Sequence, residues 1–246
     1  MKDAIRHLKR RGSLAGGVIY TVPGTRPVAG KEAASVSAPE PVKEEIIVQT
    51  SPAKPGALDV GLAELERMVA GCTKCALHES RTNTVFGEGC PSSNLVFIGE
   101  APGRDEDRQG VPFVGRAGKL LDKMIAAIGF AREEIYIANI LKCRPPNNRD
   151  PKEDEVNACR KYLARQIELI DPVIICALGR VAGQNLLGKN EPLRVLRQGE
   201  HHYNGIRVIV TYHPAALLRN PNWKKGAWED LQLLKKLHDR FTGAGA

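Results

Sequence analysis

Four cysteines in this chain have the spacing that a metal site requires. One pair forms a C-x-x-C motif and the other pair lies further along the chain: Cys72, Cys75, Cys143 and Cys159. A single C-x-x-C motif is compatible with a redox dithiol, half of a zinc site or chance. A second pair, in a chain without an export signal, favours a four-thiolate metal or iron–sulfur site. Thiolate spacing alone does not separate zinc from iron.

The composition limits the classes of protein to which the chain can belong. It has 246 residues, 42% of them hydrophobic, which suits one ordinary domain plus an extension. Its formal net charge of +8 suits a polyanionic partner such as nucleic acid. No stretch approaches the ~20 apolar residues that span a bilayer, and the basic N-terminus lacks the apolar core of a signal peptide. We therefore expect a cytoplasmic protein, nucleoid-associated if prokaryotic, with no membrane partner.

The chain divides into an extension and a domain. Residues 1–57 begin with a basic stretch, are proline-rich from residue 21 onward and show no sustained periodicity. Such a segment cannot bury enough apolar surface to offset its ordering entropy, so we expect it to be disordered. From residue 58 onward Leu62, Leu65 and Val69 recur at helical spacing and lead into the first cysteine pair. Residues 58–246 are therefore predicted to form one domain.

Within that domain, apolar runs alternate with segments of helical periodicity. The four apolar runs are residues 95–98, 135–138, 173–178 and 208–211. The helical segments between and after them are residues 120–128, 153–170, 181–187 and 227–241. This alternation predicts an α/β fold with a central four-stranded parallel sheet and helices on both faces.

Polar groups follow three of these predicted strands. The first strand leads into residues 99–103, Gly-Glu-Ala-Pro-Gly, the second into Asn139, and the fourth into His213. Ligands of open α/β sheets bind beyond the carboxyl ends of the strands, so these groups mark a candidate site. Residues 99–103 lack the dinucleotide and Walker patterns, but glycines let backbone N–H groups approach a ligand closely. The alternative is a tight turn with Glu100 solvated.

Three side chains could recognise a planar base. The Asn139 amide pairs a donor with an acceptor and complements N3–H and O4 of uracil. Phe113, in the glycine-flanked loop 112–118, could stack on a base. His213 could donate a hydrogen bond to a developing anion. The alternatives are a turn residue, a core ring and a structural histidine. Leu217, Leu218 and Arg219 suit a wedge that enters a base stack, or the first turn of a buried helix.

Together these segments resemble the family 4 uracil-DNA glycosylases, the iron–sulfur branch of their superfamily. The resemblance covers about residues 60–240 and is carried by residues 72–75, 99–103, 112–118, 139–146 and 213–215. It implies a monofunctional glycosylase of base excision repair that acts as a monomer on uracil in single- or double-stranded DNA. Such an enzyme hydrolyses the N-glycosidic bond of flipped-out deoxyuridine and leaves an abasic site.

The resemblance also implies roles for individual residues. The four cysteines would hold a structural [4Fe-4S] cluster. The uracil pocket would consist of Gly99, Glu100, Ala101, Phe113, Asn139 and His213. Glu100 and His213 would be catalytic, by orienting water toward C1′ and by facing O2 of the base, although Asp105 and Glu106 compete with Glu100 for the first role. Residues 217–219 would be the DNA wedge.

Other interpretations remain open from the sequence alone. One branch of the superfamily traps uracil-DNA covalently through a histidine in a basic loop, but residues 143–149 contain no histidine, which favours turnover. A non-catalytic uracil-DNA-binding protein with a redox-sensing cluster would carry the same motifs. A zinc module would use the same thiolates, and it would be colourless where an iron–sulfur protein is brown.

Overall fold

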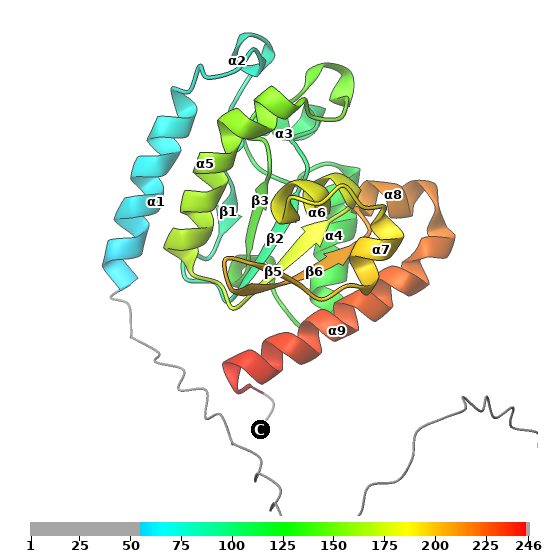
Figure 1. The fold of residues 1–246 in the computed structure, drawn as a ribbon. Helices are drawn as coiled ribbons and strands as arrows, with labels where there is room; N and C mark the ends of the chain where they lie inside the picture. Colours follow the sequence, from blue (N-terminus) through cyan, green and yellow to red (C-terminus); the bar gives the residue numbers. More distant parts are fainter. Residues whose placement is uncertain (1–54, 245–246) are drawn as a thin grey trace, which may run out of the picture. The chain divides into compact units, whose positions relative to one another are not determined.

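The structure, a computed structural model, describes residues 55–244 (Figure 1). The extension predicted for residues 1–57 lies outside this range, except for its last three residues, which begin helix α1 (Pro55–Ala70). None of the helices described is both long enough and apolar enough to cross a membrane.

A mixed six-stranded sheet lies at the centre of the domain, in the order β1-β3-β2-β4-β6-β5. Its four central strands are parallel: β3 (Tyr136–Asn139), β2 (Leu95–Gly99), β4 (Ile174–Leu178) and β6 (Ile206–Thr211). These are the four apolar runs, with ends displaced by one or two residues. The parallel order brings the carboxyl ends of β2, β3 and β6 to one edge of the sheet.

The prediction of a four-stranded, wholly parallel sheet was wrong in extent. Two short strands, β1 (Glu88–Gly89) and β5 (His201–Tyr203), pair antiparallel at the two edges. Neither contains an apolar run, because an edge strand of two or three residues contributes little to the core. Their pairing is therefore decided by the neighbouring strand and not by their own sequence.

Helices cover both faces of the sheet, as the alternation predicts (Figure 1). One face carries α1, α5 (Glu153–Ile170), α6 (Arg180–Leu187) and α7 (Leu193–Gln198). The other face carries α4 (Arg116–Ala127), α8 (Pro214–Arg219) and α9 (Lys224–Thr242). Strand β2 is buried on both sides: Val96 and Ile98 join the first core, Leu95 and Phe97 the second. This alternation follows from the period of two along a strand.

Short helices complete the connections. They are α2 (Leu77–Ser80), α3 (Arg104–Gln109), η1 (Arg132–Glu134), η2 (Pro146–Asn148) and η3 (Pro221–Trp223). The sequence pattern does not predict α3 or α7, since α3 carries no apolar stripe and α7 is shorter than two turns.

A buried ion pair fixes the end of β6, just before His213. The Arg197 guanidinium donates to both carboxylate oxygens of Asp230, at 2.7 and 3.0 Å, and to the Tyr212 hydroxyl at 2.9 Å. The Thr211 hydroxyl donates to the same carboxylate at 2.7 Å. Arg197 also lies over the Tyr212 ring. Helix α7, strand β6 and helix α9 are thereby joined at one point beside the candidate site.

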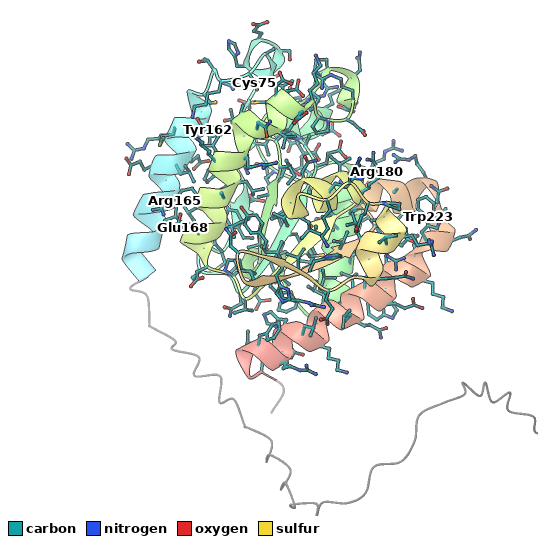
Figure 2. All side chains as sticks on the ribbon, in the orientation of Figure 1. Cys75, Tyr162, Arg165, Glu168, Arg180 and Trp223 are labelled. Carbon is teal, nitrogen blue, oxygen red and sulfur yellow. The ribbon has the colours of Figure 1, made fainter. Side chains whose placement is uncertain are left out.

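We expect the substitution Asp230→Asn to lower the free energy of unfolding by about 3–5 kcal/mol, because it leaves the Arg197 charge buried without a counter-charge. Urea denaturation measures the difference. The matched control is Glu168→Gln, which breaks the exposed Arg165–Glu168 pair on the outer face of α5 (Figure 2) and should cost under about 0.5 kcal/mol. Equal losses in the two variants would contradict a special role for the buried pair.

Candidate active site

A cavity of about 360 Å³ opens at the carboxyl ends of β2, β3 and β6. Its walls include five of the six residues predicted to form a base pocket, Glu100, Ala101, Phe113, Asn139 and His213. The sixth, Gly99, lies behind the wall, opposite Asn139 in the register of β2 and β3. The structure therefore brings together residues that the sequence separates by more than one hundred positions.

Gly99 is where the wall residues approach most closely. A side chain there would overlap the Asn139 Oδ1 atom, and its Cβ would lie 2.6 Å from Cζ of Phe113. The amide and the ring thus occupy the space that any larger residue would fill. This close approach explains the glycine at the end of β2.

The Phe113 loop is held in an unusual conformation. Phe113 has a positive φ of 53°, which bulky residues rarely adopt. The Glu106 carboxylate holds the loop by accepting hydrogen bonds from the backbone N–H groups of Val114 and Gly115, at 3.0 and 2.9 Å. The ring belongs to the second core and also lines the cavity, 5.6 Å from the His213 ring. The core and pocket interpretations of Phe113 are therefore compatible.

Asn139 presents an unused acceptor. Its side chain is 1% exposed, and its Oδ1 atom has no hydrogen-bond partner among the described residues. A buried acceptor left without a partner costs about 1–3 kcal/mol. The backbone of Asn139 is anchored, because Nζ of the buried Lys142 donates to its carbonyl and to that of Phe86, each at 3.0 Å. The Oδ1 atom of Asn139 can therefore accept a hydrogen bond from a ligand with little rearrangement of the surrounding residues.

His213 is a neutral donor. It caps α8, and its Nδ1 atom accepts a hydrogen bond of 3.1 Å from the Ala215 N–H, so that the ring proton resides on Nε2. Burial, together with the nearby Arg219 charge, lowers the pKa of His213 to about 4. At neutral pH the imidazole is uncharged and can offer Nε2–H.

Glu100 is the carboxylate of the cavity wall with a perturbed acidity. Burial raises its pKa to about 7, Asp150 adds to the increase and Arg180 opposes it. Asp150 and Arg180 form an ion pair of 2.9 Å at the rim. The two competing carboxylates are engaged by other groups, although Glu106 also lines the cavity. Asp105 is near two exposed arginines, and Glu106 binds the Phe113 loop.

The predicted wedge is only partly available. Leu217 is 1% exposed and packs in the second core, so this predicted wedge residue does not lie at the surface of the structure. The physical reason is that α8 begins at Pro214 and turns this side chain inward. Leu218 is 45% exposed, and Arg219 is also exposed and lines the cavity.

A second groove, of about 570 Å³, adjoins the cavity and shares Arg219 with it. Four arginines from separate segments line it: Arg104, Arg116, Arg144 and Arg219. No sequence motif distinguishes the first three as members of one groove. The positive net charge was the available signal, but it does not say which arginines converge.

The four predicted metal-site cysteines lie around one space. Cys72 and Cys75 follow α1, Cys143 follows β3 and Cys159 lies in α5; all four are free and line the same small cavity. Burial is the main cause of the raised pKa values of Cys75, Cys143 and Cys159. No three His, Cys, Asp or Glu side chains of residues 55–244 are grouped as a site for a single metal ion.

Comparison with known proteins places these features in a family. The model of the uracil DNA glycosylase superfamily matches residues 86–232. A type-4 uracil-DNA glycosylase of Sulfurisphaera tokodaii is 46% identical over 72% of this chain and 84% of its own length. One from Archaeoglobus fulgidus is 45% identical over 72% and 92%. A type-5 enzyme of Thermus thermophilus is 28% identical over 52% and 68%.

Proposed function

Since the chain belongs to the uracil-DNA glycosylase superfamily, and within it to the type-4 uracil-DNA glycosylases, we propose that it excises uracil from DNA. It hydrolyses the N-glycosidic bond of flipped-out deoxyuridine, releases uracil and leaves an abasic site for base excision repair. The observation that carries the proposal is the buried, unpartnered Oδ1 atom of Asn139 in a cavity between Phe113 and His213. A non-catalytic binding protein is not favoured.

The cavity suits uracil through complementary hydrogen bonding. Oδ1 of Asn139 accepts from N3–H of the base, and its amide nitrogen donates to O4. Cytosine presents the reverse pattern and would leave the buried amide unsatisfied. Phe113 provides an apolar face for the ring.

We expect Asn139→Asp to reduce kcat/KM for uracil by about 10- to 100-fold, because the carboxylate cannot donate to O4. The ratio of uracil to cytosine excision should fall with it. Oligonucleotides that carry one uracil or one cytosine provide the measurement. Asn204→Asp, in an exposed turn, is the matched control. Unchanged activity on both bases would refute the base-reading role.

Two wall residues support the cleavage step. The C1′ atom is inaccessible inside a duplex, so the nucleotide must be flipped out at a cost of a few kcal/mol. Bond cleavage leaves negative charge on uracil, which Nε2–H of His213 stabilises at O2; such a donor is worth about 3–4 kcal/mol. The Glu100 carboxylate orients water toward C1′ and stabilises the cationic sugar.

The reaction should therefore require ionised Glu100. Since its pKa is about 7, the rate should rise with pH through that region, while His213 stays neutral above about pH 4. Glu100→Gln should lower kcat and abolish the rise in rate near pH 7, whereas Glu168→Gln should retain this rise. Single-turnover rates between pH 5 and 9 test the assignment. If the rise in rate near pH 7 persists in Glu100→Gln, another group is responsible for it.

The raised pKa of Glu100 also makes the stability of the fold depend on pH, in the direction opposite to the reaction rate: the stability falls as the pH rises. The folded pKa of Glu100 lies above its ordinary value of 4.5, so the native state binds the proton more tightly than the unfolded chain does. The stabilisation is complete below about pH 4.5 and is lost as the pH rises through about 7. Burial that prepares the carboxylate for catalysis thus weakens the fold in the working range.

We propose no lyase step, because no lysine lines the cavity in the described part of the chain. Uracil-containing oligonucleotides incubated with the protein should be cut after alkali and remain intact without it. Cutting without alkali would contradict a monofunctional enzyme. Absence of alkali-dependent cutting would overturn the glycosylase itself.

The groove of four arginines supports a path for the DNA strand on either side of the flipped nucleotide. Guanidinium groups bind phosphate in a sequence-independent way. Leu218 lies on this groove with Arg219, which supports a wedge of these two residues. The cavity and the groove are formed by one chain, which supports action as a monomer on single- or double-stranded DNA.

The four cysteines fit a structural [4Fe-4S] cluster. Their thiols line one common space, and four cysteine thiolates are the usual ligands of such a cluster. Such a cluster would cross-link the end of α1, the segment after β3 and helix α5. It would lie beside the strand that carries Asn139 and away from the base cavity.

A further inference from the structure

Arg81 connects the two halves of the cysteine site. Its Nη1 atom donates to the Cys143 sulfur at 3.3 Å and to the Cys72 carbonyl at 2.8 Å. Its Nη2 atom donates to the Ala70 carbonyl at 3.1 Å. One guanidinium therefore binds the end of α1, where the first cysteine pair begins, and the first sulfur of the second pair.

The chemistry of these contacts suits a bound cluster. A cluster held by four thiolates carries net negative charge, and a thiolate accepts a stronger hydrogen bond than a thiol does. Arginine keeps its charge under all ordinary conditions and offers five donors in one plane. It can therefore compensate the cluster's charge and satisfy two backbone carbonyls at the same time.

Neighbouring basic side chains do not duplicate the hydrogen bond to Cys143. Lys142 also lines the cysteine cavity, but its Nζ atom donates to the Phe86 and Asn139 carbonyls. Lys74 lies over the Tyr162 ring, and His78 binds the Cys75 carbonyl. Among the described residues, Arg81 is the cation with a hydrogen bond to a cluster-site sulfur.

The segment around Arg81 also extends toward the base cavity. The N–H of the next residue, Thr82, donates to the Asp107 carboxylate at 2.9 Å, and Asn83 donates to the Asp107 carbonyl. Asp107 lies in α3 beside Glu106, which holds the Phe113 loop. A change at Arg81 could thus reach the loop through backbone contacts of α3.

We propose that Arg81 is a positioning residue for the cluster: it holds the two cysteine pairs in register and raises the cluster's reduction potential by donating to the Cys143 thiolate. The inference rests on the cluster proposed above. A hydrogen bond and a positive charge at a ligand sulfur both stabilise the more negative, reduced form. The residue acts on the cluster and does not touch the DNA base.

The test compares the wild-type protein with Arg81→Gln and Arg81→Lys. Arg67→Gln is the matched control, since Arg67 is an exposed arginine of α1 whose side chain donates to the Ala63 carbonyl and, among the described residues, to no cysteine sulfur. Iron content, the rate at which visible absorbance is lost in air, and the reduction potential are measured on each purified protein. Uracil excision is measured in parallel on the same samples.

We expect Arg81→Gln to lose its cluster about tenfold faster than the wild type and to have a more negative potential. Arg81→Lys should retain most of the potential, since it keeps the charge, but lose the cluster faster than the control. If Arg81→Gln purifies without iron while the control retains it, the role of Arg81 in holding the cysteine pairs is supported. The effect on the reduction potential is then measured in Arg81→Lys. Wild-type stability and potential in both variants, as purified or after reconstitution, would overturn the inference.

The failure of this inference can be told apart from failure of its premise. A wild-type protein without iron would overturn the cluster proposal. A wild-type protein with iron and unaltered Arg81 variants would overturn only the role of Arg81. Uracil excision by the wild type in either case leaves the glycosylase function standing.

Discussion

The register of β2 against β3 places Gly99 opposite Asn139, and the base cavity depends on the absence of a side chain at that glycine. The Asn139 amide and the Phe113 ring both enter the space that a Cβ would occupy. A parallel pair of strands ends at one edge, so this single register also sets where Glu100 and the segment after Asn139 emerge. The Asn139 amide and the Glu100 carboxylate are thereby placed by one backbone pairing.

Around this point, three parts of the cavity wall are oriented by hydrogen bonds to neighbouring residues. Ala215 determines the tautomer of His213, Glu106 holds the Phe113 loop, and Lys142 anchors the carbonyl of Asn139. These contacts use backbone groups, which move little. The functional atoms that remain unused, above all Oδ1 of Asn139, are free for a ligand. Pre-organisation of this kind reduces the free energy needed to bind and orient a base.

Much of the fold and of the site could be predicted from the sequence. The central strands are apolar runs because both of their faces are buried, and the carboxyl ends of such strands carry the candidate residues. Edge strands β1 and β5 could not be predicted, because two or three residues paired on one side need no apolar pattern. Leu217 was assigned to the wedge together with Leu218 and Arg219 as one expected exposed loop, but these residues form a helix, which turns successive side chains to different sides.

The sequence by itself determined the available chemistry: four thiols, an amide, an imidazole and several carboxylates, in an order typical of one family. Only the tertiary structure decided which carboxylate stands in the cavity wall with a raised pKa, which leucine faces solvent and which arginine reaches a cysteine sulfur. Local periodicity reflects which face of an element is buried. Which side chains contact one another across the fold depends on residues far apart in the chain, such as Arg81 and Cys143. No local sequence pattern predicts these contacts.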